Sequence, residues 1–475
     1  MKRYFKFSLL FLVLVFSNYL SKSQGCSGFN IKKESEIVST CSGIAMTMIH
    51  DVTGKAYLYV ANKESGLKIY DISTITSPNL VKSIPISLLG NMDVMNLTQS
   101  GNYLYLALGN HFNTNQNAGM AIIDVLVPFD ATVMDFWELP SSGGGAGVIK
   151  VEGNYAYLGA MKFGLMILNV SNKGDIQLVS KFVPDINYPT KNPNPDLYNA
   201  RGMEIKNDII YLCYDAGGIR IINVSDKAKP KETGHYSNPA LNGKARAYNN
   251  LVLDDSLLYI AVDYCGLEIL NVKDTSNIKL RGKWNPYNCP TNNWFTSPVH
   301  ANEIQYNKAC KTAFVSTGKS DMMVLDVSNP TQPDSCNFYG GISNDIGTWG
   351  VGLYQNQIYL SYICSIIPFS SNWTGVKILT YTSCTNSIKN EDLIGISLYP
   401  NPSKNRLTIQ SGFSLDKSKI SVINSLGQTI YPEITINSSS QVDINLESFS
   451  NGIYSIVISS GNKYYTSKFT KNLEF

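Results

Sequence analysis

The heptapeptide LKIYDIS at residues 67–73 recurs six times further along the chain. Successive copies begin 45 to 55 residues apart, and a period near 50 residues with strand-like content indicates a repeat architecture. Each copy therefore marks one structural unit. The later copies are MAIIDVL (120–126), LMILNVS (165–171), IRIINVS (219–225), LEILNVK (267–273), MMVLDVS (322–328) and VKILTYT (376–382).

Each copy of the heptapeptide has the same neighbours along the sequence. About ten residues upstream lies an aromatic strand such as YLYVA (57–61), and the last residue of this strand is small in all seven units. A short apolar segment precedes it, as in VIKVEG (148–153), and a fourth segment follows the heptapeptide, as in IQLVSKF (176–182). Short apolar segments separated by polar turns predict a four-stranded antiparallel meander in every unit.

The central strands of each meander are apolar on both faces, so each sheet needs a neighbour on either side. Seven four-stranded sheets arranged radially meet this need, which predicts an all-β fold with a seven-bladed β-propeller over 35–384. The heptapeptides resemble the LVIVD repeat, which forms propeller blades, and the resemblance spans about 36–382. Blade seven lacks a fourth strand of its own, whereas 35–41 has no partner in blade one. We expect this N-terminal strand to complete blade seven and close the ring.

The start of the chain combines basic residues with an apolar run at 7–16 and small residues at 21–23. This order is typical of a secretory signal peptide over 1–23, too short in its apolar part to span a bilayer. We expect cleavage after Ser23, an N-terminal segment at 24–34 and no transmembrane segment in the mature chain. Lipidation at Cys26 is an alternative, although the leucine usual three residues before such a cysteine is missing.

Export makes disulfide bonds an expectation for the nine cysteines. We call the face formed by the links between blades and by the links from second to third strands the upper face, and the opposite face the lower face. Sorting the cysteines by face leaves Cys213 buried and free, although sequence alone admits other pairings. The expected bonds are Cys41–Cys364 and Cys265–Cys289 on the upper face, and Cys26–Cys384 and Cys310–Cys336 on the lower face.

The composition changes after a polar linker at 385–396, and short alternating strands at 397–475 predict a small C-terminal β-sandwich. This region contains Tyr399, Pro400, Asn401 and Pro402, followed by Gly427, Gly452, Tyr454 and Lys468. These residues closely resemble the type A C-terminal sorting domain of Bacteroidetes type IX secretion. The resemblance implies that the type IX secretion machinery is a partner, that this domain is removed, and that the protein is attached to the cell surface or released.

The long loops of the repeat region all belong to the upper face, whereas the lower face has mainly tight turns. Loops of varied length on a regular scaffold commonly form binding surfaces. We therefore expect a ligand near the propeller axis, where the innermost strands begin and polar and aromatic side chains converge. The candidate binding residues are Asp93, Arg201, Tyr248, Asn249, His300, Asn302, Glu303 and Trp349.

No sequence motif assigns a catalytic residue, a cofactor or a metal site. The four histidines lack metal-ligand spacing, and HExxH-like, GxSxG and paired-cysteine motifs are missing. An Asp or Asn recurs at the end of the heptapeptide strand, as at Asp71 and Asn169, and is expected to hydrogen-bond the following turn. The net charge of +3 without a run of one sign gives no support for nucleic-acid binding.

Three functions of different class remain open at this stage. The first is a monomeric, secreted or surface-displayed binding propeller for a polysaccharide or protein ligand, without enzymatic activity. The second is an extracellular hydrolase or lyase acting on polysaccharide, for which Asp93 and Glu303 are the acids that the sequence offers. The third is a structural or adhesive surface protein. The missing catalytic motifs favour the first.

Overall fold

The computed structural model describes residues 29–382 and 396–472, except 292, 342–345, 365, 367, 370, 412, 417, 425–427 and 461–462. The chain divides into two compact units, Met1–Cys384 and Thr385–Phe475. The expected signal peptide, the Cys26–Cys384 pair, nearly all of the linker, and Gly427 lie outside the described residues. Within the described part, no helix is both long and apolar enough to cross a membrane.

The first unit contains the seven four-stranded antiparallel sheets that the repeats predict. In six of them the strands pair in chain order from the innermost to the outermost. Among the described residues, five short 3-10 helices lie in the links. Blades one to three consist of β2 (Thr47–His50), β3 (Tyr57–Ala61), β4 (Leu67–Asp71) and β5 (Asn79–Ile84); β6 (Val94–Ser100), β7 (Tyr103–Leu108), β8 (Gly119–Asp124) and β9 (Thr132–Glu138); and β10 (Val148–Glu152), β11 (Tyr155–Gly159), β12 (Leu165–Asn169) and β13 (Gln177–Phe182). Blades four to six consist of β14 (Gly202–Lys206), β15 (Ile209–Cys213), β16 (Ile219–Asn223) and β17 (Lys231–Tyr236); β18 (Tyr248–Asp254), β19 (Leu257–Val262), β20 (Gly266–Asn271) and β21 (Lys279–Trp284); and β22 (Ile304–Asn307), β23 (Thr312–Ser316), β24 (Met322–Asp326) and β25 (Asp334–Tyr339). The 3-10 helices are η2 (Ile86–Leu88), η3 (Pro128–Asp130), η4 (Pro195–Leu197), η5 (Pro239–Leu241) and η6 (Asp263–Cys265).

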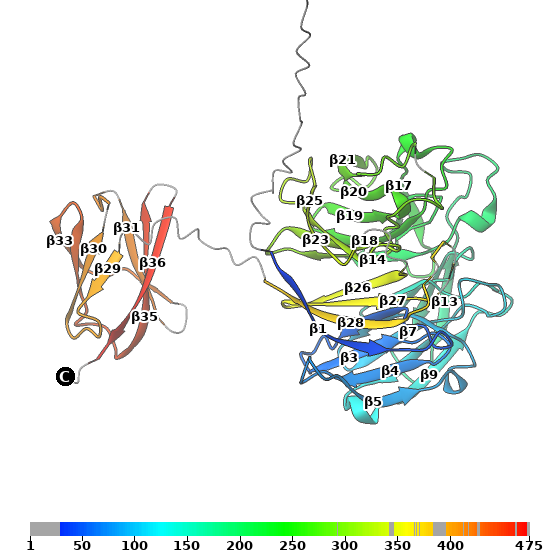
Figure 1. The fold of residues 1–475 in the computed structure, drawn as a ribbon, viewed down its shortest axis with the longest axis horizontal. Coiled ribbons are helices and arrows are strands. Elements are labelled where there is room, and N and C mark those ends of the chain that lie inside the picture. Colours follow the sequence, from blue (N-terminus) through cyan, green and yellow to red (C-terminus); the bar gives the residue numbers. More distant parts are fainter. Residues whose placement is uncertain are drawn as a thin grey trace, which may run out of the picture. The chain divides into compact units, whose positions relative to one another are not determined.

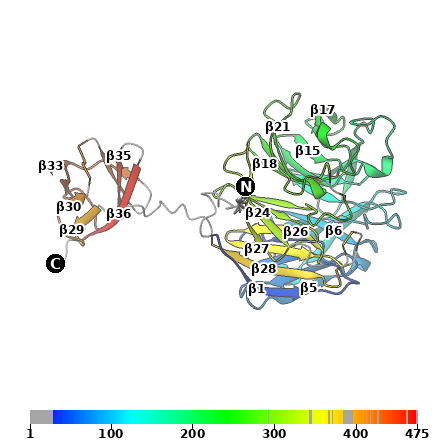
Figure 2. The same ribbon diagram turned by 45° about the horizontal axis from the view of Figure 1, so that its top comes forward.

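Blade seven joins the two ends of the propeller sequence. It consists of β26 (Thr348–Tyr354), β27 (Gln357–Tyr362) and β28 (Gly375–Tyr381), with β1 (Ile31–Val38) as its outermost strand. The blue β1 lies along the yellow β28 in both views (Figures 1 and 2). The N-terminal strand therefore closes the ring as expected, although it begins at Ile31 rather than at residue 35. This pairing covers one edge of β28 that would otherwise be open.

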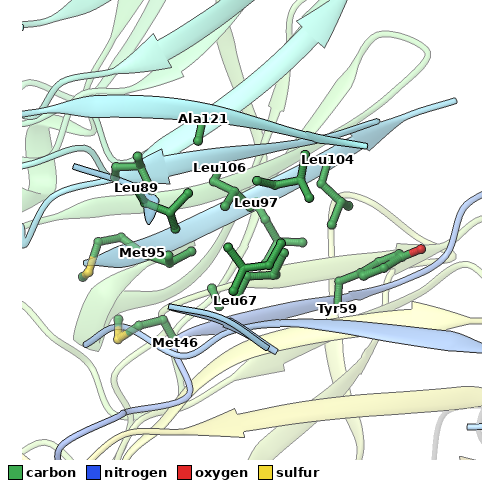
Figure 3. Packing of buried hydrophobic residues seen from close by; sticks show 14 of the residues in the cluster. Met46, Tyr59, Leu67, Leu89, Met95, Leu97, Leu104, Leu106 and Ala121 are labelled. Atoms are coloured by element: carbon green, nitrogen blue, oxygen red, sulfur yellow. The ribbon is translucent and has the colours of Figure 1, made fainter. Parts of the chain in front are cut away.

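The apolar faces of neighbouring blades form the core. Between blades one and two, Leu67 of β4 packs near Leu104 and Leu106 of β7, and all three side chains are fully buried (Figure 3). Burial of each such leucine contributes roughly 1.5–3 kcal/mol. The small residues that end the second strands lie where blades approach most closely. A Cβ added at Gly159, for example, would stand 2.9 Å from the carbonyl oxygen of Ala200.

In blades one to six, the Asp or Asn at the end of the third strand caps the following turn, as expected. The Oδ1 atom of Asp71 accepts a hydrogen bond from the backbone N–H of Ser73 at 2.8 Å. The same bond to the N–H two residues later occurs in blades two to six, from Asp124, Asn169, Asn223, Asn271 and Asp326. These side chains are therefore occupied by local structure.

Two of the expected disulfide bonds are present on the upper face. Cys41 is bonded to Cys364 with a Cα–Cα distance of 5.6 Å, and Cys265 to Cys289 at 5.0 Å. Cys213 is free and fully buried, and burial raises the pKa of its thiol well above the usual value.

The expected bond between Cys310 and Cys336 is wrong. Both cysteines are disulfide-bonded, but no bond between two described residues joins them. Cys310 lies in the turn between β22 and β23, whereas Cys336 lies in β25, the second strand from β23. Two strand spacings amount to about 10 Å, beyond the roughly 7 Å Cα separation that a disulfide spans. Matching cysteines by face ignored their different distances from the axis.

The second unit is a sandwich of two four-stranded sheets. Their buried faces share one core that includes Leu407, Val422, Ile444 and Ile456. One sheet has the order β29 (Ile396–Tyr399), β30 (Arg406–Ser411), β34 (Gln441–Asn445) and β33 (Ile434–Ser438), and the other β32 (Thr429–Ile430), β31 (Lys419–Ile423), β35 (Gly452–Ser460) and β36 (Lys463–Lys471).

The motif residues of this sandwich meet at its last strand. The Asn401 side chain donates to the carbonyl oxygen of Lys468 at 3.1 Å and accepts from the N–H of Thr470 at 2.9 Å. Tyr454 stacks on Phe469 with ring centroids 5.4 Å apart. The loop after β29 is thereby fixed to β36.

Candidate functional site

A cavity of about 400 Å³ lies on the upper face where the innermost strands begin. We call it the upper-face pocket. Its walls come from the links of blades two, four, five, six and seven, so it forms only when the ring is closed. Five of the eight predicted residues line it, namely Arg201, Asn249, His300, Asn302 and Trp349.

Trp349 and Arg201 form the aromatic and cationic part of the pocket. Trp349 lies on β26, with the Phe112 ring edge-on at 5.4 Å and the His111 ring at 6.1 Å. The Arg201 guanidinium lies 5.7 Å from the centre of the indole ring, within cation–π range. Burial, with a smaller effect of the Arg201 charge, lowers the pKa of His111 to about 3, so this imidazole is neutral at physiological pH.

The Arg201 side chain has no hydrogen bond and no ion pair with any residue that the structure describes. Its neighbour Arg246 differs, since the Nε of Arg246 donates to the Ala216 carbonyl and one of its terminal nitrogens to Asn242. Arg201 therefore keeps its five donors available to a ligand.

A second group in the pocket is organised by Asp263, which the sequence analysis did not select. Its Oδ1 atom is 2.7 Å from Nδ1 of His300, and its Oδ2 atom accepts from Nε1 of Trp294 at 2.7 Å. Both carboxylate oxygens are thus used to hold two rings in the pocket wall. Disulfide bonds fix the same walls, because Cys265 follows Asp263 by two residues, and Cys364 precedes the segment that contributes Phe369.

Asp215 is the other acid in the pocket, and it too was missed. It accepts one hydrogen bond from Asn199 at 3.0 Å. Burial raises its pKa to about 6, partly offset by the positive charge of Arg201. A signal was available in the repeats, since Asp215 and Asp263 occupy equivalent positions, two residues and one residue after the ends of β15 and β19. Blade one has Lys63 and blade three has Met161 at the matching place.

Asn249 and Asn302 connect blades as well as lining the pocket. The Nδ2 atom of Asn249 donates to the Ala301 carbonyl at 2.9 Å, and that of Asn302 donates to the Thr348 carbonyl at 2.8 Å. Each amide therefore reaches from one blade to the start of the next. The Oδ1 atom of Asn249 has no hydrogen-bond partner among the described residues.

Three predicted residues lie away from the pocket. Asp93 is buried and pairs with Lys63 at 3.1 Å, while Asn110 and Gln116 donate to its two oxygens. Tyr248 is fully buried in the core of blades four and five, and its hydroxyl donates to Glu268 at 3.0 Å. Both side chains turn into the protein because they have internal partners there.

Glu303 lines a different cavity of about 220 Å³ in the central channel, formed by the innermost strands. Burial raises its pKa to about 7. Lys150 and Glu204 form an ion pair of 2.8 Å in the same cavity, and His50 stacks on Tyr354 there. Asp93 and Glu303 therefore do not share a site, and the pair of acids that the sequence offered for catalysis is wrong.

No group of three or more His, Cys, Asp or Glu side chains is placed to hold a metal ion within the described ranges. The upper-face pocket brings cationic, aromatic and acidic side chains together. It contains the Arg201 guanidinium, which has no hydrogen-bond or ion-pair partner among the described residues, and two rings that Asp263 holds by hydrogen bonds. Asp263 accepts hydrogen bonds at both oxygens, whereas Asp215 accepts one.

Comparisons with known proteins agree with this architecture. The LVIVD repeat matches residues 51–85, 143–183 and 311–339, and the Secretion system C-terminal sorting domain matches 397–472. An ulvan lyase from Nonlabens ulvanivorans is 32% identical over 146 residues, which are 30% of this chain and 27% of the lyase. The chain thus spans just over a quarter of that relative's length.

Solved β-propellers share the fold at low sequence identity. The β-propeller domain of Cps50 (Swd1) from Myceliophteria thermophila has a TM-score of 0.51 and 11% identity, covering 74% of this chain and all of that chain. A chain of a mitotic checkpoint complex has a TM-score of 0.50 and 10% identity, covering 74% and 90% respectively. At such identities the likeness concerns the fold alone. The chain is therefore a β-propeller with LVIVD repeats in three of its segments, followed by a Secretion system C-terminal sorting domain, which indicates export by type IX secretion to the cell surface or the extracellular space.

Proposed function

We propose that the exported propeller is a non-enzymatic binding protein whose polysaccharide or protein ligand occupies the upper-face pocket. The observation that supports this most directly is Arg201, an unpaired guanidinium beside the Trp349 ring in a cavity of about 400 Å³. Small-molecule sites combine apolar walls with a few directed polar groups in this way, and Trp and Arg dominate binding energy at many interfaces. The partial similarity to an ulvan lyase supports a polysaccharide as the first ligand to test.

An extracellular hydrolase or lyase is the second candidate, and Asp215 is the observation that favours it. A carboxyl group with a pKa of about 6 in a cavity could act as a general acid near neutral pH. Its acidic neighbour Asp263 already accepts hydrogen bonds at both oxygens from His300 and Trp294. A hydrolase needs a second carboxylate free to activate water or to attack. This difference places binding ahead of catalysis in our proposal.

Binding is tested by applying the secreted protein to arrays of glycans and peptides, followed by calorimetry on any ligand found. We expect Trp349→Ala and Arg201→Ala each to weaken binding at least about tenfold, equal to about 1.4 kcal/mol. Arg201→Ala should leave the melting temperature little changed, whereas Trp349→Ala removes a buried ring from the core and should lower it. His50→Ala, in the central channel, is the matched control and should bind normally. Normal binding by both pocket variants, together with loss of binding in His50→Ala, would show that the ligand binds in the central channel and not in the upper-face pocket.

Catalysis is tested on the same ligands by following new reducing ends and unsaturated products. Turnover that disappears in Asp215→Asn would favour the enzyme, and binding without turnover would favour the binding protein. The absence of both on all arrays would leave the structural or adhesive role.

A further inference from the structure

The charged side chains that line the upper-face pocket are unequal in sign and in availability. Three are cationic, Arg201, Lys244 and Arg246, and two are acidic, Asp215 and Asp263. The chain as a whole is close to balanced, with 39 basic and 36 acidic residues. Three basic and two acidic side chains give the cavity a formal excess of one positive charge.

The two acidic side chains differ in how far hydrogen bonds occupy their oxygens, and neither of them contacts Arg201. Asp263 directs both of its oxygens to His300 and Trp294, at 2.7 Å in each case. Asp215 receives one hydrogen bond from Asn199. Neither acid forms an ion pair with Arg201 within 4 Å, so the guanidinium is not neutralised by a contacting carboxylate of the described residues.

The surroundings of Arg201 suit a planar anionic group next to a ring. A guanidinium presents two parallel N–H donors that match a carboxylate or a sulfate oxygen pair. Its position 5.7 Å from the centre of the Trp349 ring puts these donors beside the part of the indole that lines the pocket, although Trp349 itself is only 9% exposed. A sugar ring with an acidic substituent can engage both features at once, because the ring covers the indole while the substituent reaches the guanidinium.

We infer that the ligand of the upper-face pocket is an acidic saccharide, with its carboxylate or sulfate bound by Arg201 and its ring packed on Trp349. This inference rests on the proposed binding function and narrows it to one ligand class. An acidic peptide would meet the guanidinium equally well, but the partial similarity to an ulvan lyase favours a saccharide. Peptide binding is therefore an outcome of the test below.

The test compares saccharides that differ only in charge. Oligogalacturonates and their methyl esters share ring stereochemistry and size, so any difference in affinity reports the carboxylate. Sulfated and desulfated galactan oligosaccharides form a second pair for the sulfate, and acidic peptides a third probe. For the full secreted chain we expect at least one acidic saccharide to bind ten or more times tighter than its neutral counterpart.

Variants connect that difference to the residue. In Arg201→Gln the preference for the acidic saccharide should fall to less than about twofold. Arg201→Lys should keep part of this preference, because the positive charge remains although the paired donors of the guanidinium are lost. Arg281→Gln, an exposed arginine on the outer strand β21, is the matched control and should retain the full preference. Because the Arg201 side chain makes no hydrogen bond, these variants should keep the wild-type melting temperature.

Salt provides a readout that does not depend on any variant. Raising NaCl from 0.05 to 0.5 M shortens the Debye length from about 14 to about 4 Å, so binding of the acidic saccharide should weaken while binding of its neutral counterpart changes little. Equal binding of acidic and neutral saccharides would overturn the inference and leave the binding function standing. Binding of acidic peptides and of no saccharide would overturn the assignment of the ligand as a saccharide. Failure of every probe would overturn the inference of an acidic saccharide, and the glycan and peptide arrays would then decide the binding function.

Discussion

The Cys41–Cys364 disulfide should stabilise the propeller more than the Cys265–Cys289 disulfide does. The first joins residues 323 positions apart, and the second joins residues 24 positions apart. A disulfide lowers the entropy of the unfolded chain by an amount that grows with the logarithm of the closed loop. Taken singly, the loop-entropy relation gives about 5.8 kcal/mol for the longer loop and about 3.5 kcal/mol for the shorter loop.

The expected loss of melting temperature follows from the size of the domain. An unfolding entropy of about 2.1 cal/mol/K per residue over about 350 residues gives about 0.7 kcal/mol for each degree. The double variant Cys41→Ala, Cys364→Ala should therefore melt roughly 8 °C lower than wild type, and Cys265→Ala, Cys289→Ala roughly 5 °C lower. Scanning calorimetry of the full secreted chain without reductant measures both.

The comparison between the two double variants decides the matter, because each removes one bond from the same face of the same domain. An equal loss, or a larger loss for the shorter loop, would refute the idea that ring closure is the source of the stability. A larger loss of melting temperature for the variant without the longer loop would support it. This difference from wild type should then disappear when the wild-type protein is measured under reductant.

Three further predictions concern other parts of the molecule. Deletion of residues 24–41 should expose the free edge of β28 and lead to aggregation or strand exchange, seen as a shift from monomer in light scattering, whereas a monomer of unchanged melting temperature would count against the closure by β1. The affinity for an acidic saccharide should rise about tenfold between pH 8 and pH 5. The reason is that Asp215, with a pKa of about 6 beside Arg201, gains a proton and no longer repels the anion. In Asp215→Asn the affinity should be constant over this range, and a pH profile like that of wild type would refute the assignment to Asp215. Intact mass of the exported protein should show an N-terminus near Gln24 and loss of residues beyond about 396, whereas a full-length product in the cytoplasm would contradict export.

The blades were predictable because they repeat. The apolar strands and the small residue at Gly159 follow from rules that act within a few residues, and the sequence repeats them in all seven blades. The turn cap at Asp71 follows from a rule of the same kind and recurs in six blades. Even the closing strand could be found by counting, since β1 had no partner and blade seven lacked one.

The position of the pocket could be predicted from the sequence, but the full set of residues that line it could not. Arg201 and Trp349 stand at the starts of inner strands, where the alignment of blades puts them on the axis. Asp215 and Asp263 stand in links whose conformation depends on neighbouring blades, so their approach to the pocket could not be judged from local spacing. Tyr248 shows the opposite error, because its position fits the rim while its hydroxyl finds Glu268 inside.

Because of the two upper-face disulfides, the rigidity of the pocket walls depends on the cellular compartment in which the chain lies. Cys265–Cys289 holds the link that carries Trp294, and Cys41–Cys364 holds the start of the segment that carries Phe369. In the reducing cytoplasm neither bond persists, so both walls are then free to move. A newly made chain in the cytoplasm would thus carry an upper-face pocket with two walls that are not fixed. These walls would become fixed only after export, in a compartment where thiols are oxidised.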